Sequence, residues 1–175
     1  MTSYWHAVKA SVDGGEGRGL SICAFRLETD LADGTAPATA AKDGRGLTYP
    51  FDAVPGAGEA IEVAPGVLWL RFALPFQLDH VNVYAIRDGD GWVVVDTGLK
   101  TAATIAAWET ALDATLGGRP VTRLICTHMH PDHIGLAGWL CERSGAPLLM
   151  SRLEYVTARM LIAEEAGDAP ADGER

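Results

Sequence analysis

The chain carries the stretch Thr127-His128-Met129-His130-Pro131-Asp132-His133-Ile134-Gly135, which holds three of its five histidines. Imidazole nitrogens and carboxylate oxygens bind zinc at about 2.0–2.2 Å. His128 and His130 can turn both rings toward one ion if the backbone between them is extended. After the turn set by Pro131, the adjacent Asp132 and His133 can point toward a second ion. The spacing predicts a metal-binding loop, and the alternative is a polar surface loop with incidental histidines.

The flanking segments predict where this loop lies. Leu124-Ile125-Cys126-Thr127 is a short apolar run that indicates a buried strand, and Ile134 to Arg143 is a helix candidate with Gly135 and Gly138 on one side. A loop between the end of a strand and the start of a helix is where α/β proteins hold their ligands. The loop is therefore expected at the carboxyl edge of a sheet.

A second strand end is predicted at the same edge. Trp92 to Asp96 reads as a strand, and Thr101 to Leu116 as a helix whose apolar stripe is Ile105, Trp108, Leu112 and Leu116. Strand, helix and strand in this order form a crossover unit with parallel strands, so Asp96 and His128 should leave neighbouring strand ends. A buried Asp96 can accept a histidine N–H and fix the tautomer of that ring. Its alternative role, as a cap of the following helix, is compatible with the same position.

Two motifs resemble those of a known family. His128-x-His130-x-Asp132-His133 resembles the H-x-H-x-D-H signature of the metallo-β-lactamase superfamily, and Val93-Val94-Val95-Asp96-Thr97-Gly98 resembles the family strand that ends in Asp-Thr-Gly. The resemblance implies an α/β fold, the αββα sandwich, of which this chain would hold the N-terminal half. It further implies that His128 and His130 bind a first metal ion, that Asp132 and His133 bind a second, and that Asp96 supports these ligands.

The same resemblance implies a metal-dependent hydrolase, similar to the glyoxalase II-like and β-lactamase-like members. Two Zn²⁺ ions would be the cofactors, since zinc lowers the pKa of a bound water to about 7. The resulting hydroxide would attack the carbonyl of a small-molecule ester, thioester or lactam, with Asp132 also orienting the attacking water.

Two alternatives to this function remain. The same donors suit Fe, so a mononuclear iron oxygenase or a flavin-linked module on the same fold is possible on chemistry alone. No histidine follows His133, and the later aspartates Asp168 and Asp172 lie in a polar tail. A catalytically incomplete fragment or a non-catalytic remnant is the other alternative.

Composition narrows the partners and the location. The formal net charge of −9 disfavours nucleic acid as a partner. The three cysteines, Cys23, Cys126 and Cys141, are odd in number and widely spaced, which suggests a reducing compartment, and the latter two lie in apolar segments typical of a core. No apolar run approaches membrane-spanning length. We expect a cytoplasmic protein without a membrane partner, and the oligomeric state stays open.

The chain divides into two parts by composition. Residues 1–48 are rich in glycine, alanine and charge, with strand-like character at Leu20 to Leu27 alone, and they predict a flexible extension. Residues 49–175 would form the N-terminal half of the metallo-β-lactamase-like domain.

Further elements are expected within residues 49–175. The candidate strands are Ala60–Val63, Val67–Phe72, Val81–Ile86 and Pro147–Met150, and Asp88-Gly89-Asp90-Gly91 predicts a hairpin turn before Trp92. The loop from Pro75 to His80 is apolar, so Phe76 and Leu78 either form a wall of a substrate groove or cap the core. Ser151 and Glu154 predict a capping box, and the helix that follows is expected to bury Leu153, Val156, Met160 and Ala163.

Overall fold

The computed structural model describes residues 41–42 and 48–165, which belong to two compact units. The unit that spans Gly15–Val54 contains strands β1 (Ala41–Lys42) and β2 (Thr48–Tyr49), which pair antiparallel. The predicted strand at Leu20 to Leu27 lies outside the described residues. The composition of residues 1–48 predicts no strand at Ala41–Lys42, and this prediction is wrong because pairing with Thr48–Tyr49, not composition, makes the segment a strand.

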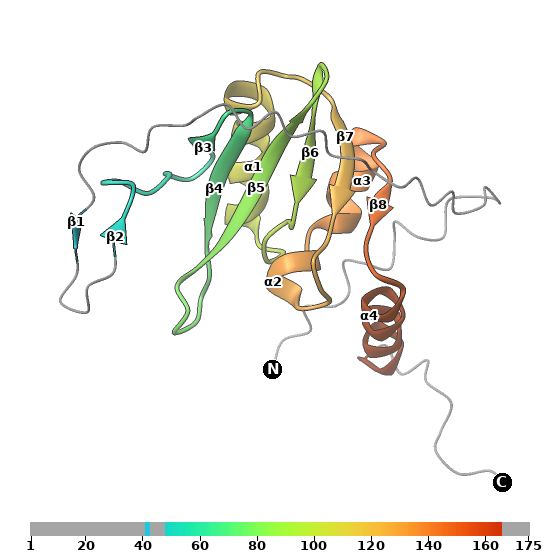
Figure 1. Cartoon of the computed structure of the whole chain (residues 1–175). Coiled ribbons are helices and arrows are strands. Elements are labelled where there is room, and N and C mark those ends of the chain that lie inside the picture. Colours follow the sequence, from blue (N-terminus) through green and yellow to red (C-terminus); the bar gives the residue numbers. More distant parts are fainter. Residues whose placement is uncertain (1–40, 43–47, 166–175) are drawn as a thin grey trace, which may run out of the picture. The chain divides into compact units, whose positions relative to one another are not determined.

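The unit that contains residues 55–165 is built on one six-stranded sheet (Figure 1). The spatial order of the strands is their order in the sequence: β3 (Ile61–Ala64), β4 (Val67–Ala73), β5 (His80–Asp88), β6 (Gly91–Val95), β7 (Val121–Ile125) and β8 (Leu148–Leu149). The pairs from β3 to β6 are antiparallel, whereas β6–β7 and β7–β8 are parallel. The predicted hairpin at Asp88–Gly91 and the predicted parallel pair are both confirmed.

The helices lie between β6 and β8 in the chain, except for the last, which follows β8. They are α1 (Ala102–Thr110), the π-helical turn η2 (Ala111–Thr115), α2 (Pro131–Ile134), α3 (Ala137–Ser144) and α4 (Arg152–Glu165). Thr101 caps α1, because its side chain accepts a hydrogen bond from the backbone N–H of Thr104 at 3.0 Å. None of the helices within the described residues is both long enough and apolar enough to span a membrane.

The helix expected from Ile134 to Arg143 is divided into α2 and α3 at Gly135 and Leu136. The backbone of Gly135 packs against the loop that follows β6, and a Cβ atom there would lie 2.9 Å from the Lys100 nitrogen and 3.0 Å from the Gly98 oxygen. The helix breaks where its backbone contacts the backbone of another loop. The helical periodicity of the sequence does not predict such a contact.

The core lies between the sheet and the layer of α1 and α3 (Figure 1). Alternate residues of the central strands are fully buried, as in Leu70, Val83, Val94 and Leu124. Trp108 of α1 is also fully buried and packs on Phe72 of β4, with 5.1 Å between the ring centroids. Cys126 is buried in this core and Cys141 is half-buried against it, so the core role expected for them is confirmed.

The burial predicted for the helix after Ser151 is wrong for three of the four residues named, while the fourth, Ala163, is half-buried. Leu153, Val156 and Met160 are 74%, 54% and 52% exposed, whereas Ala158 and Ile162 are the buried residues of α4. The apolar stripe is present in the sequence, but in the described part of the chain α4 turns a different, smaller face toward its neighbours.

The fold class is mixed α/β, as expected. Residues 55–165 provide one six-stranded sheet and its helices, which corresponds to one half of an αββα sandwich. The carboxyl ends of the parallel strands β6 and β7 lie side by side, and the loop of three histidines leaves this edge.

Candidate metal centre

Asp96 is the residue that joins the two strand ends. It follows β6 directly, is 5% exposed, and donates its backbone N–H to the Ile125 oxygen at 2.8 Å. Its φ of 63° lies in the left-handed region, which costs a non-glycine residue roughly 1–3 kcal/mol. Such strain persists where surrounding contacts hold the residue in place. In this position the carboxylate turns toward the loop that follows β7.

The Asp96 carboxylate accepts hydrogen bonds from two residues of that loop. The Thr127 N–H donates to Oδ1 at 2.8 Å, the Thr127 hydroxyl lies 3.1 Å from Oδ1 and 2.9 Å from Oδ2, and His133 Nδ1 lies 2.8 Å from Oδ2. Burial opposes ionisation, but the hydrogen bonds from His133 and Thr127 outweigh it and hold the pKa of Asp96 below its usual value. Asp96 is therefore an anion at the centre of the loop's hydrogen bonds.

His133 is oriented by this anion. An ionised carboxylate is an acceptor alone, so His133 Nδ1 carries the proton that it donates to Asp96. The hydrogen bond raises the pKa of His133, against the opposing effect of burial. In the neutral ring the lone pair is left on Nε2, which lies 3.4 Å from Asp132 Oδ2.

His128 and His130 form a second pair. Thr127 Oγ1 lies 2.9 Å from His128 Nδ1, and since the hydroxyl proton is directed to Asp96, the Nδ1–H of His128 donates to Thr127. His128 Nε2 then has the lone pair, and it lies 3.0 Å from His130 Nδ1. Burial, followed by the neighbouring His133 and His130, lowers the pKa of His128, which favours the neutral, ligating form.

All four predicted ligands therefore meet in one cluster, with the rings of His128 and His133 4.0 Å apart at their centroids. Two donors that bind one zinc ion tetrahedrally at about 2.0–2.1 Å are separated by about 3.4 Å. The 3.0 Å between His128 and His130 and the 3.4 Å between Asp132 and His133 are close to this separation. The donor chemistry and the spacing of each pair fit a divalent metal ion.

The cluster does not offer three donors to one point. Among the residues that the structure describes, no group of three or more His, Cys, Asp or Glu side chains is placed to hold a metal ion. The loop thus presents two half-sites, each of two donors.

Three residues that support this loop were not singled out for that purpose in the sequence analysis. Thr127 links Asp96 to His128, as described above. Thr97 is fully buried and donates both its N–H and its hydroxyl to the His133 oxygen at 2.8 Å, while its hydroxyl accepts from the Leu136 N–H at 3.0 Å. Thr97 follows Asp96 and Thr127 precedes His128 in the sequence. This adjacency to the motif residues is the sequence feature that could have identified both threonines as supporting residues.

The third supporting residue is Glu154. Ser151 caps α4 as predicted, since its hydroxyl accepts from the Glu154 N–H at 3.2 Å. The Glu154 carboxylate, however, accepts the backbone N–H of Met129, between the two histidines, at 2.8 Å. The capping box provided a signal for Glu154, but it assigned the wrong donor to the carboxylate.

The loop between β4 and β5 lies at the same edge of the sheet, because β4 and β6 run in the same direction. Phe76 and Leu78 are exposed, so they do not cap the core. His80 makes local hydrogen bonds with Asp79 and with Arg71.

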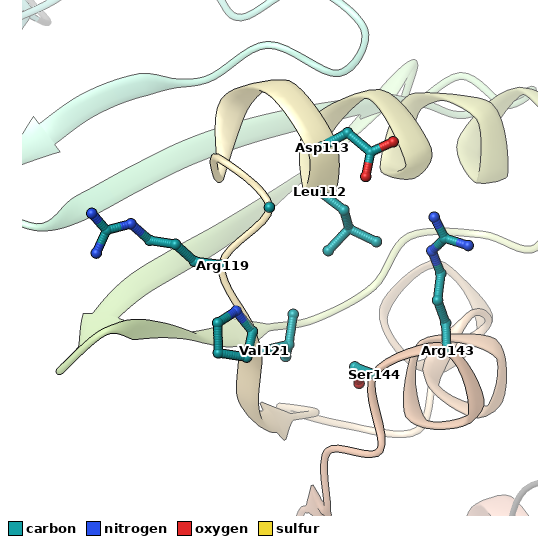
Figure 2. Close-up of a pocket in the computed structure, with 8 residues that line it drawn as sticks. Leu112, Asp113, Arg119, Val121, Arg143 and Ser144 are labelled. Atoms are coloured by element: carbon teal, nitrogen blue, oxygen red, sulfur yellow. The ribbon is translucent and has the colours of Figure 1, made fainter.

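A separate open cavity of about 330 Å³ lies at the opposite end of β7 (Figure 2). It is lined by Leu112, Asp113, Gly118, Arg119, Pro120, Val121, Arg143 and Ser144. Arg143 points toward the side of Asp113, whereas Arg119 points away from it (Figure 2). Val121 begins β7 and the histidine loop follows its end, so this cavity is not part of the metal cluster.

Comparison with known proteins agrees with this arrangement. Residues 77–172 match the family model of the metallo-β-lactamase superfamily. A probable metallo-hydrolase, YybB, of Bacillus subtilis (strain 168) is 32% identical over 92 residues, which cover 49% of this chain and 40% of that protein.

Among solved structures, a β-lactamase domain protein from Burkholderia ambifaria is 44% identical, with a TM-score of 0.58, over 62% of this chain and 34% of that one. The chain therefore spans less than half the length of either relative. The family match covers more than half of this chain and includes β6 with the Asp96 that follows it, the histidine loop and all of α4. On this ground, the chain belongs to the metallo-β-lactamase superfamily.

Proposed function

We propose that this chain contributes the metal-binding loop of a metallo-hydrolase that cleaves an ester, thioester or lactam carbonyl. The observation that carries the proposal is the pair of two-donor half-sites, in which hydrogen bonds to Asp96 and Thr127 leave the ligating nitrogens of His133 and His128 unprotonated. The name of the Bacillus relative, a probable metallo-hydrolase, supports the same reaction class.

A divalent ion held there, zinc by preference for this donor set, would act as a Lewis acid that acidifies a water molecule and polarises a carbonyl. The residues of the chain supply orientation. Asp132 has a second carboxylate oxygen that can accept a proton from the attacking water while Oδ2 faces His133. Asp96 holds the His133 ring in the ligating tautomer.

The substrate is proposed to be a small molecule with an apolar part. Phe76 and Leu78 are exposed on the β4–β5 loop at the same edge of the sheet as the histidine loop. Small-molecule sites are lined mainly by apolar side chains, with a few polar groups that fix the orientation of the ligand. The acidic net charge of the chain, −9, supports an expectation of no nucleic-acid substrate.

We expect the isolated 175-residue chain to bind zinc weakly and to show no hydrolysis above background. A catalytic zinc site uses three protein ligands and an open position, and each half-site here supplies two. Calorimetric titration with Zn²⁺, together with assays on ester, thioester and β-lactam substrates, measures both properties. Elemental analysis of the purified chain distinguishes zinc from iron.

His130→Ala provides the matched comparison for the titration, since it removes one donor of one half-site. It should weaken the remaining zinc binding further and leave the fold intact, because His130 is exposed. Tight binding of two metal ions per chain, with turnover that His130→Ala abolishes, would show that the half-sites are complete and contradict the expectation.

A further inference from the structure

We infer that Glu154 of α4 is a positioning residue for the histidine pair His128 and His130, through its hydrogen bond to the backbone of Met129. The part of this inference that concerns metal affinity rests on the proposed function, whereas the part that concerns the backbone of the loop does not.

The contact joins two segments that are 25 residues apart in the sequence. The Met129 N–H donates to Glu154 Oε2 at 2.8 Å, and Met129 is the residue between the two histidines. A backbone donor paired with an ionised carboxylate forms one of the stronger hydrogen bonds available in proteins. The peptide that sets the relative direction of the two rings is therefore held from outside the loop.

Glu154 completes a second point of attachment for this loop. On one side of His128, the Thr127 N–H donates to the carboxylate of Asp96 at 2.8 Å. On the other side, the Met129 N–H donates to the carboxylate of Glu154. The backbone of His128 thus lies between two carboxylate acceptors, one following β6 and one on α4, and both bonds restrict the direction of its ring.

The local sequence of α4 shows that this contact replaces another. In a complete capping box, the glutamate side chain turns back to the N–H of the capping serine. Here Ser151 still accepts from the Glu154 N–H, at 3.2 Å, but the glutamate carboxylate is directed to Met129. Glu154 therefore has a tertiary partner in the histidine loop where the local motif would give it a partner within its own helix.

The expected consequence is that the position of α4 influences the separation of His128 Nε2 and His130 Nδ1, which is 3.0 Å. Residues that orient metal ligands typically change metal affinity by about 10–100-fold when they are removed. Loss of the Glu154 carboxylate should therefore free the Met129 peptide and lower the affinity of the histidine pair, without removing any ligand.

The test uses four variants of the full chain. Glu154→Ala removes the acceptor, and Glu154→Gln keeps an oxygen at the same reach without the charge. Ser151→Ala removes the helix cap but leaves the Glu154 carboxylate. Glu164→Ala, an exposed glutamate on the same helix, is the matched control. Circular dichroism establishes that each variant is folded.

The first measurement is amide hydrogen exchange at Met129 in the metal-free chain. We expect Glu154→Ala to accelerate this exchange by about tenfold or more, since a hydrogen bond to a charged group is lost. Glu154→Gln should restore part of the protection, and Glu164→Ala should leave it unchanged. The inference is overturned if Glu154→Ala and Glu164→Ala give the same Met129 exchange, or if Ser151→Ala accelerates it as much as Glu154→Ala does.

The second measurement is zinc affinity by competition with a chromophoric chelator. Glu154→Ala should weaken the affinity by about tenfold, with partial recovery in Glu154→Gln. An unchanged affinity beside accelerated Met129 exchange would overturn the positioning role toward metal. Absence of zinc binding in the unsubstituted chain, beside the same accelerated exchange, would overturn the proposed function while supporting the backbone role of Glu154.

Discussion

At the scale of single residues, one carboxylate organises the candidate site. Asp96 accepts hydrogen bonds from Thr127 and His133, and it does so from a left-handed backbone conformation that aims it at the loop. Asparagine also tolerates this conformation, whereas most residues do not. Asp96→Asn therefore removes the charge without imposing a new backbone strain.

Asp96→Asn should lower the pKa of His133 toward its ordinary value of 6.5, because the hydrogen bond to the Asp96 carboxylate is the largest cause of its elevation. NMR titration of the His133 ring in the metal-free chain measures this change. Asp90→Asn, at the exposed β5–β6 turn, is the control. A His133 pKa that is the same in Asp96→Asn and in the unsubstituted chain would refute the assignment.

The same substitution should change the pH dependence of stability. The contribution of protonated His133 to folding stability is fully present below pH 6.5, the ordinary pKa of histidine. It is lost as pH rises through the raised pKa of His133 in the folded chain. The contribution of ionised Asp96 to folding stability is fully present above pH 3.8, the ordinary pKa of aspartate. It is lost as pH falls through the lowered pKa of Asp96 in the folded chain. The pair should thus stabilise the metal-free chain most between these values, and urea unfolding should show a loss of about 1–3 kcal/mol in Asp96→Asn within that window.

At the scale of elements, α1 fixes the loop after β6. Trp108 is fully buried, packs on Phe72 of β4, and donates its indole N–H to the Thr97 oxygen at 2.7 Å. Thr97 in turn holds the His133 carbonyl and the start of α3. Helix α1 is therefore linked to the histidine loop through the side chain of Trp108 and the segment of chain at Thr97.

Trp108→Phe should destabilise the chain because it leaves a cavity and a Thr97 carbonyl without its donor. The expected cost is roughly 2–4 kcal/mol, from the lost volume and the unpaired buried acceptor. Urea unfolding followed by circular dichroism measures it. Trp139→Phe, at a half-buried site on α3, should cost less. Equal losses of unfolding free energy for the two variants would mean that the hydrogen bond between Trp108 and Thr97 does not add to the stability of the chain.

At the scale of the whole unit, strand register aligns apolar side chains across the sheet. Successive partners place Ile61, Trp69, Tyr84, Val95, Ile125 and Leu149 in one row over all six strands. Tyr84 and Leu149 are exposed, and the other members of the row are half-buried. Ile86, two residues after Tyr84 on β5, is exposed as well. Side chains on this row alternate with the fully buried residues that face α1 and α3, so they belong to the opposite face of the sheet.

Apolar side chains that are exposed or half-buried along a row of this length should cause the isolated chain to associate as its concentration rises. Sedimentation velocity over a concentration series measures the association. Ile86→Lys places a charge on the same face of the sheet as this row and should shift the chain toward monomer, whereas Ala103→Lys, on the exposed side of α1, should not. A chain that remains monomeric at all concentrations would contradict this expectation.

The sequence by itself determined the features that depend on near neighbours along the chain. Two motifs identified Asp96 and the four candidate ligands, and the strand, helix and strand order placed Asp96 and His128 on one edge of the sheet. The turn at Asp88–Gly91 determined the hairpin of β5 and β6. These features were predictable because spacing, periodicity and turn chemistry are set by residues close in sequence.

The tertiary structure alone decided which groups meet across long distances in the chain. The stripe of Leu153, Val156 and Met160 has a helical period, but the period does not say which face of α4 finds a partner. The break at Gly135 arises from backbone of the loop after β6, and Glu154 bonds Met129 instead of its own helix terminus. For Gly135 and Glu154 the deciding atoms lie more than twenty residues away in the sequence, where local pattern carries no information, and packing alone brings the two segments together.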